Sequence, residues 1–99
     1  MKRDAPTLDR LLHALADPTR RTILRLLKEK GCCSLAKPVG LCACDIEARI
    51  KRSQPTVSHH MGVLTQAGLV QAEKYGTWVW YRRNEKALKG LVEALGTEL

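Results

Sequence analysis

Hydrophobic residues recur at helical spacing through the first thirty positions of the chain. The leucines between residues 7 and 16 are spaced i, i+3, i+4, i+7, which places them on one face and predicts an amphipathic helix. Asp17 then offers an N-cap, and Pro18 suits a first helical position, so a second helix is expected to run to about Lys30. Its aliphatic residues should face inward and its arginines outward.

The middle of the chain predicts a helix-turn-helix. After a loop over residues 32–41, a short helix is expected with Asp45 in its first turn. Ser53 is a candidate N-cap for a further helix over residues 54–67, which Gly68 would end. Only three residues separate the two helices, a spacing typical of helix-turn-helix units.

The last third of the chain predicts a β-hairpin followed by a helix. Strand-like runs over residues 69–73 and 77–82 flank a turn at 74–76, and an amphipathic pattern covers 85 to about 95. The expected fold is therefore mainly α with a β-hairpin wing: a winged helix-turn-helix of five helices, in one domain spanning residues 1–99. A domain this small cannot bury both the first and the last helix on itself. These two helices are therefore the predicted homodimer interface. Its expected apolar residues are Leu8, Leu11, Leu12, Leu88, Leu91 and Val92.

Composition narrows the class of protein. The 99 residues carry a net charge of +7, which suits a polyanionic partner, and no apolar run approaches the roughly eighteen residues of a membrane span. No signal sequence is recognisable, so a cytoplasmic protein without membrane contact is expected. No nucleophile arrangement and no glycine-rich phosphate loop is visible, so we do not expect an enzyme.

Polar and basic residues gather on the predicted recognition helix and wing. Val57, Met61 and Leu64 are spaced to face the core, which leaves the polar residues of the first two turns facing outward, where recognition helices read bases. His60 is expected to be partly buried and hydrogen-bonded, and the two hairpin tryptophans are expected to pack. The predicted contacts to double-stranded operator DNA are Gln54, Thr56, Ser58, His59, Lys51, Arg52, Lys74 and Arg82.

Four cysteines lie within thirteen positions: Cys32, Cys33, Cys42 and Cys44. In a reducing compartment such thiols are ligands or reactive groups rather than disulfides, the alternative being small buried hydrophobes. Thiolates select soft centres such as As(III), Sb(III), Cd, Pb or Cu(I), and nearby positive charge is expected to ease deprotonation. Helix positions two apart differ by about 200°, so Cys42 and Cys44 can share one ion only if the chain there is extended or the helix start unwinds.

Several segments resemble those of the ArsR/SmtB metalloregulators. They are residues 15–24, which begin Leu-Ala-Asp-Pro-Thr-Arg, residues 53–60, which read Ser-Gln-Pro-Thr-Val-Ser-His-His, and residues 64–69 and 76–82. The resemblance covers nearly the whole chain. It implies a homodimeric winged-helix repressor that binds its operator without inducer and leaves when the inducer binds.

The segment Leu-Cys-Ala-Cys-Asp-Ile around Cys42 and Cys44 resembles a box found in arsenic-sensing and cadmium/lead-sensing members, which implies that both cysteines are inducer ligands. Glu47 stands where arsenic sensors commonly carry a third cysteine, and the N-terminal cysteines of the cadmium/lead sensors are missing. Three-coordinate As(III) needs three sulfurs, so the expected set is Cys42, Cys44 and one of Cys32 or Cys33, within one subunit. The zinc-sensing residue set of the last helix is absent, so that mode is not expected.

The leading hypothesis is therefore a repressor with As(III) or Sb(III) as inducer and no permanent cofactor. Inducer binding would pull on the short helix before the recognition helix and shift the population away from the DNA-competent form. A Cd(II)/Pb(II) sensor using all four thiolates, or a thiol redox switch, remains an alternative of the same fold. A thiol oxidoreductase or metal carrier that does not bind DNA is less expected, because no Cys-x-x-Cys motif is present and no wing would be needed.

Overall fold

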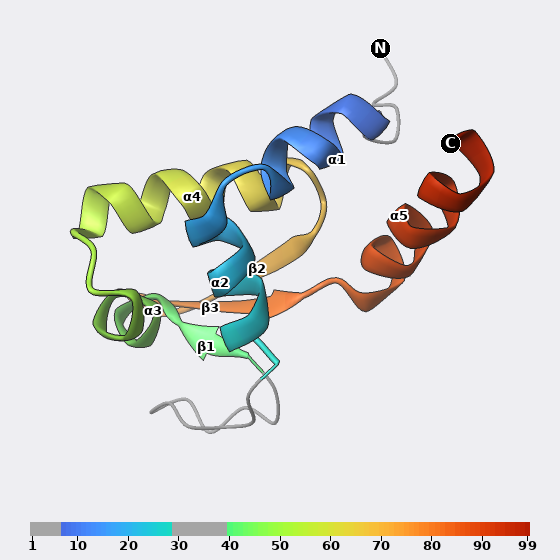
Figure 1. The fold of residues 1–99 in the computed structure, drawn as a ribbon. Coiled ribbons are helices and arrows are strands. Elements are labelled where there is room, and N and C mark those ends of the chain that lie inside the picture. Colours follow the sequence, from blue (N-terminus) through green and yellow to red (C-terminus); the bar gives the residue numbers. More distant parts are fainter. Residues whose placement is uncertain (1–6, 29–39) are drawn as a thin grey trace, which may run out of the picture.

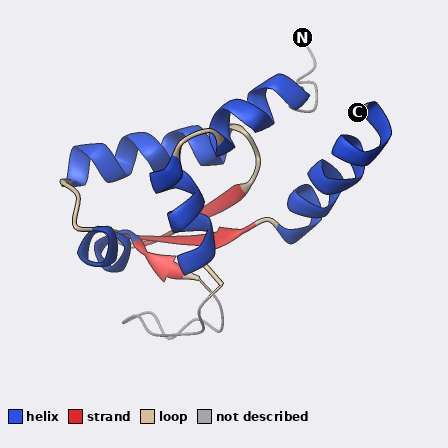
Figure 2. Ribbon diagram, in the orientation of Figure 1, coloured by secondary structure: helices blue, strands red, loops and turns tan. Residues whose placement is uncertain are grey.

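The computed structural model describes residues 7–28 and 40–99, and within these ranges the elements follow the predicted order (Figures 1 and 2). The helices are α1 (Leu8–Leu15), α2 (Pro18–Leu26), α3 (Ala43–Ile50), α4 (Gln54–Gln66) and α5 (Glu85–Glu98). The strands β1 (Leu41–Cys42), β2 (Val70–Tyr75) and β3 (Trp78–Arg83) form an antiparallel sheet in the order β1-β3-β2. The predicted winged helix-turn-helix is thus confirmed. Cys32 and Cys33 lie outside the described residues.

Local sequence explains where the helices begin. The Asp17 carboxylate accepts the backbone N–H groups of Thr19 and Arg20 at 2.7 and 3.2 Å, which caps α2 as predicted. Thr7 caps α1, and Asn84 caps α5, each through a side-chain oxygen. The first turns therefore have partners for backbone donors that the helix itself cannot satisfy.

The core is aliphatic and lies between α2, α4 and the sheet. Val57, Met61 and Leu64 of α4 are buried, as their spacing predicts, and Ala14 of α1 is fully buried beside them. The other members of this cluster with at most 6% exposure are Ile23, Leu24, Leu27, Leu41, Ile46, Ala67, Leu69 and Val70.

Arg20 corrects the expectation that the arginines of α2 face outward. It is only 7% exposed; its Nε donates to the Ala14 carbonyl at 2.7 Å and its Nη2 donates to the His13 carbonyl at 3.1 Å. Its Nη1 lies 3.2 Å from Nδ1 of His60, which confirms the half-buried, hydrogen-bonded role expected for that histidine. The guanidinium therefore satisfies carbonyls at the end of α1 and ties α1 to α4.

Two element boundaries differ from their predictions. α2 ends at Leu26 rather than near Lys30, because the N–H of Lys28 bonds the Arg25 carbonyl in a tighter i→i−3 turn at 3.2 Å. The hairpin turn comes later than predicted, since Tyr75 pairs with Trp78. Only Gly76 and Thr77 form the loop, and the positive φ of Gly76, 63°, suits a two-residue hairpin turn.

Different helices lie at the two ends of the molecule. α1 and α5 contact each other at the end that carries the C-terminus, whereas α3 and the beginning of α4 lie at the opposite end (Figure 1). Among the described residues, no helix has the length and apolar character needed to cross a membrane.

Candidate inducer site and nucleic-acid interface

Cys42 and Cys44 come together where β1 joins α3. Cys42 ends β1 and is the N-cap of α3, with extended backbone angles of φ −81° and ψ 163°, while Cys44 is the second residue of the helix. The two Sγ atoms are 3.0 Å apart. The chain is therefore extended at Cys42, as the sharing of one ion requires. The pair can bind one small centre without unwinding of α3.

The position of Cys42 depends on β1, where the sequence pattern predicts a loop and the start of a helix. Leu41 and Cys42 pair with Tyr81 and Trp80 of β3. Gly40, just before the strand, has a φ of 117°, and a Cβ there would lie 2.9 Å from Cζ2 of Trp80 and even closer to the Tyr81 carbonyl. The close approach of β1 to β3 therefore requires glycine at this position.

Asp45 belongs to the site as well, although it was not among the ligands expected from the sequence. The Cys42 thiol donates to Oδ2 of Asp45 at 3.2 Å, and the potential ligand atoms of Cys42, Cys44 and Asp45 all lie within 4.8 Å of one another. Cys42 is the N-cap and Asp45 is three residues on, the offset at which a side chain reaches back to the cap. That offset is the sequence signal for its role.

The proton on Cys42 is strongly held. Burial raises the pKa of this thiol to about 12, and the hydrogen bond with Cys44 and the carboxylate of Asp45 act in the same direction. Only the backbone N–H of Asp45 opposes them. The expectation that nearby positive charge eases deprotonation is wrong for Cys42, because the thiol is buried and the charge beside it, on Asp45, is negative. Cys42 is 1% exposed, whereas Cys44 is open to solvent.

An open cleft of about 350 Å³ borders Cys44 on its exposed side. It lies between α3, the first residue of α4 and the hairpin turn. The two tryptophans behave differently here: Trp80 is 1% exposed and packs with Cys42, as predicted, but Trp78 is 43% exposed, which corrects its expected packing. With Cys44, the residues that line the cleft include Glu47, Gln54, Thr77, Trp78 and Val79.

The predicted DNA contacts lie on one continuous part of the chain and on the wing. Gln54, Ser58 and His59 are exposed on the first turns of α4. Thr56 is half-buried, and its hydroxyl accepts that of Ser53 at 3.0 Å, so Ser53 occupies the predicted cap position without capping a backbone N–H. The basic members of the predicted set, Lys51, Arg52, Lys74 and Arg82, are all exposed.

The turn between α3 and α4 is tight. Lys51 has left-handed backbone angles, φ 56° and ψ 45°, and its N–H bonds the Glu47 carbonyl at 2.9 Å. A residue with a side chain adopts this conformation at a cost of about 1–2 kcal/mol, so the surrounding structure must enforce it. This tight turn links α3 directly to α4.

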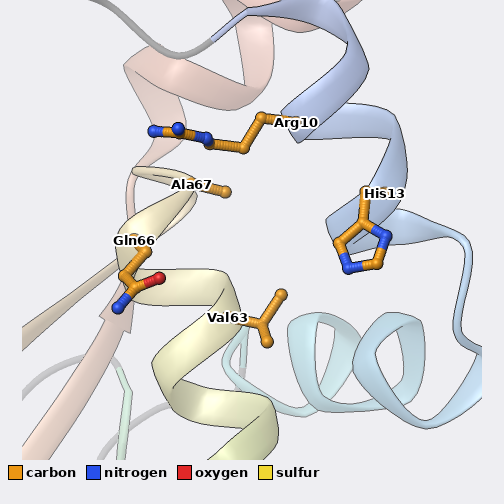
Figure 3. A pocket seen from close by; sticks show the side chains of 5 residues that line it. All are labelled: Arg10, His13, Val63, Gln66 and Ala67. Carbon is orange, nitrogen blue, oxygen red and sulfur yellow. The ribbon is translucent and has the colours of Figure 1, made fainter.

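A second cavity, of about 430 Å³, lies between α1 and α4. Arg10 and His13 of α1 face Val63, Gln66 and Ala67 at the end of α4 across this space (Figure 3). None of these residues was predicted as a site residue. The cavity is lined neither by the thiol pair nor by the predicted reading surface.

The predicted dimer residues divide by exposure. Leu12 is 41% exposed and Val92 is 69% exposed, so these side chains offer apolar surface to a partner. Leu8, Leu11 and Leu88 are half-buried. Leu91 is only 4% exposed within the single chain, because it faces inward from α5, and it can add little area to an interface.

Comparison with known proteins decides the family. A family model described as bacterial regulatory protein, arsR family, matches residues 17–72, from the cap of α2 into β2. The chain belongs to the ArsR family. Its fold and its family are those of DNA-binding transcription regulators rather than enzymes.

Individual relatives agree with this assignment. An uncharacterized HTH-type transcriptional regulator of Methanocaldococcus jannaschii is 39% identical over 83 residues, which cover 84% of this chain and 84% of that protein. An arsenical resistance operon repressor of Staphylococcus aureus is 38% identical over 88 residues, covering 89% and 76%. The structure of an ArsR-like transcriptional regulator from Rhodococcus sp. RHA1 matches with a TM-score of 0.75 at 26% identity, covering 91% of this chain and 74% of that one.

Proposed function

We propose that this ArsR-family regulator is a cytoplasmic homodimeric repressor that binds double-stranded operator DNA and leaves it when As(III) or Sb(III) binds its cysteines. The observation that carries the proposal is the 3.0 Å separation of the Cys42 and Cys44 sulfurs at the start of α3, the first helix of the helix-turn-helix. The similarity to an arsenical resistance operon repressor supports the choice of inducer.

The third ligand in this proposal is Cys32 or Cys33. Three-coordinate As(III) needs three sulfurs, and the described part of the chain brings two together. Cys33 precedes Cys42 by nine positions. This short connection favours a site built within one subunit.

The fate of the thiol protons favours a trivalent arsenic oxyacid over a divalent cation as the inducer. When As(OH)₃ reacts with three thiols, three As–S bonds replace three As–O bonds, and every thiol proton leaves in a water molecule. A cation such as Cd(II) must instead displace the protons into solvent. Because the Cys42 pKa is raised to about 12, this displacement costs more at neutral pH than it does for an ordinary thiol, whereas the net reaction with As(OH)₃ releases no proton.

One observation favours the alternative inducer, Cd(II) or Pb(II). The Asp45 carboxylate lies within 4.8 Å of both sulfurs, and a cation gains more from that negative charge than neutral arsenite does. Proton release in weakly buffered solution separates the two cases, since cadmium binding acidifies the solution and arsenite binding does not.

Release from DNA follows if the inducer-bound arrangement disfavours the DNA-competent position of α4. Drawing a third sulfur onto Cys42 and Cys44 displaces the start of α3, and the tight turn at Lys51 links α3 to α4. An inducer that prefers the displaced form shifts the population away from the form that binds DNA.

The test is fluorescence anisotropy of a labelled duplex from the upstream region of the protein's own coding sequence, with reduced protein and increasing arsenite. Release at about micromolar arsenite, reversed by excess dithiol, is expected. Cys42→Ser and Cys44→Ser should bind the duplex as tightly as the unaltered protein and ignore arsenite. Tight binding that only cadmium or lead reverses would establish the alternative, and release by oxidants alone would establish a redox switch. Failure to bind at low salt, where phosphate contacts are strongest, would refute the repressor.

A further inference from the structure

We propose that the cavity between α1 and α4 is a second ligand site, which takes a small organic carboxylate with an apolar body. The carboxylate lies on Arg10 and His13, and the apolar body lies against Val63 and Ala67. Neither the thiol pair nor the predicted reading surface lines this cavity, so the inference goes beyond the proposed function and does not rest on it.

Arg10 brings a charge to the cavity that the described part of the chain does not neutralise. Its guanidinium extends from α1 across the space toward the end of α4 (Figure 3). The arginines of α2, which are Arg20, Arg21 and Arg25, each donate a hydrogen bond within the chain, whereas the Arg10 side chain makes no hydrogen bond or ion pair with any described residue. A guanidinium with free donors binds a carboxylate through two parallel N–H···O bonds.

Two more polar side chains line the same space. His13 is three residues after Arg10 and therefore on the same face of α1, and Gln66 is the last residue of α4. An imidazole N–H and an amide NH₂ can each donate a hydrogen bond. They can therefore serve the carboxylate lone pairs that Arg10 leaves free.

The remaining wall of the cavity is apolar. Ala67 is 1% exposed, and Val63 is half-buried. The volume of about 430 Å³ falls in the range of about 300–1,000 Å³ typical of small-molecule sites, and it exceeds the roughly 150 Å³ that suffice for benzene in another protein. The cavity thus has room for a ring beside the carboxylate.

The end of α4 favours a single carboxylate over a phosphate. α4 ends at Gln66, and the carbonyl end of a helix carries about half a negative charge. This partial charge opposes a dianion more strongly than a monoanion. A phosphate ion also has no apolar part to place against Val63 and Ala67.

The cavity lies on the side of α1 that faces away from the predicted dimer contacts. Successive helical residues differ by about 100°, so Arg10 lies about 160° around the axis from both Leu8 and Leu12. His13 lies at least about 100° from the same two leucines. A second copy that packs on this leucine face leaves the cavity open to a small molecule.

The test uses benzoate as the probe, titrated into the ¹⁵N-labelled dimer and followed by NMR. Saturable shifts are expected at the amides of the cavity residues and their neighbours, with a dissociation constant of about 1 mM or less. Benzamide keeps the ring without the charge, and acetate keeps the charge without the ring, so each should bind at least about tenfold more weakly. Tighter binding of phosphate than of benzoate would overturn the assignment to a carboxylate.

Arg10→Gln should weaken benzoate binding by about tenfold or more, because a hydrogen-bonded charge is removed, and Arg10→Lys should restore part of the loss. Arg25→Gln is the matched control, since it removes the same charge from an exposed position of α2 outside the cavity. Equal weakening in Arg10→Gln and Arg25→Gln, or shifts that spread over the basic surface without saturating, would show an adventitious ion only and overturn the inference. A dimer that does not bind benzoate would overturn it as well. None of these results depends on arsenite or DNA, so they leave the proposed function to its own test.

Discussion

Burial raises the pKa of Cys42, and the side chain of Asp45 adds to this effect. The Asp45 carboxylate accepts the Cys42 thiol at 3.2 Å and places negative charge beside the sulfur. Burial and this carboxylate together hold the proton on Cys42, and the hydroxides of an arsenic oxyacid can accept it when the As–S bond forms. A divalent cation must displace the same proton into solvent.

Asp45→Asn should lower the pKa of Cys42 from about 12, because the substitution removes the negative charge and keeps the backbone N–H that favours the thiolate. Iodoacetamide should then alkylate Cys42 faster at a given mildly alkaline pH, as followed by mass spectrometry of the Cys42 peptide. Glu47→Gln is the matched control, since it removes the same charge from the same helix outside the cluster around Cys42. Equal rates in Asp45→Asn and unaltered protein would contradict this account.

His60 makes the stability of the fold depend on pH. Burial lowers the pKa of His60 below its ordinary 6.5, the charges of Arg20, His59 and Arg52 lower it further, and Asp17 opposes them. The unfolded chain therefore binds this proton more readily than the folded chain. The contribution of neutral His60 to the free energy of unfolding is fully present above about pH 6.5 and decreases as the pH falls below that value.

Urea unfolding between about pH 5 and pH 8 tests this dependence. His60→Gln removes the titrating group and keeps an acceptor for Arg20, so the decrease toward low pH should become shallower. His59→Gln, on the exposed neighbour, should retain the decrease. If both variants lose stability toward acid in the same way as the unaltered protein, another group is responsible.

Residue roles could be predicted from the sequence where they depend on spacing. Val57 and Met61 are buried because helical periodicity places them inward, which the sequence shows directly. Arg20 could not be placed this way, because its partners are carbonyls of the preceding helix and a histidine forty positions on.

Among the elements, β1 is the one on which the thiol pair depends and the one that the sequence did not reveal. Two residues cannot show the alternation of a strand, and the partner of β1 lies nearly forty positions away in β3. The longer helices were recognisable because caps and hydrophobic spacing agree within each of them. The end of α2 was not, because the helical pattern continues past the tighter turn at Lys28.

Gly40→Ala should displace β1. The added Cβ meets Trp80 and the Tyr81 carbonyl at a backbone φ of 117°, so we expect a loss of about 2 kcal/mol or more in the free energy of unfolding. The arsenite response should weaken as well, because Cys42 follows two residues later.

Gly90→Ala is the matched control for this substitution. Gly90 lies inside α5, and a Cβ there meets nothing within 4 Å, so alanine should stabilise the helix by about 0.5–1 kcal/mol. Urea unfolding measures both effects. Two variants of equal stability would show that β1 tolerates a side chain at position 40.

At the scale of the molecule, α3, which begins at the thiol pair, and the start of α4 lie at the end opposite to α5 and the start of α1 (Figure 1). This separation leaves the flanking helices available for a second copy of the chain. Leu12 and Val92 are exposed there, with half-buried leucines beside them. A dimer joined through this end would present two reading surfaces to one duplex.

Leu12→Glu/Val92→Glu should therefore convert the dimer into a monomer, because the substitutions place charge on the surfaces that the proposed interface buries. Sedimentation velocity should show the halved mass, and circular dichroism should show an intact fold. Ala72→Glu, at an exposed position of β2, introduces the same residue away from α1 and α5 and should remain dimeric. A double variant that remains dimeric would exclude this interface.

The net charge of +7 favours DNA binding only where its cations contact phosphates, and the salt dependence of DNA binding counts those contacts. Each phosphate contact contributes about 0.9 to the slope of log affinity against log salt concentration. Arg82→Gln removes one exposed wing cation per chain, so a dimer on a single duplex should lose about 1.8 from the slope and a monomer only about 0.9.

Gln54→Ala should leave the slope unchanged and lower the preference for the operator over unrelated DNA by about 1–3 kcal/mol, because a base contact carries sequence information and a phosphate contact does not. If Arg82→Gln leaves the slope unchanged, the wing does not contact the phosphates. If Gln54→Ala lowers the slope instead of the preference, α4 contacts the backbone rather than the bases.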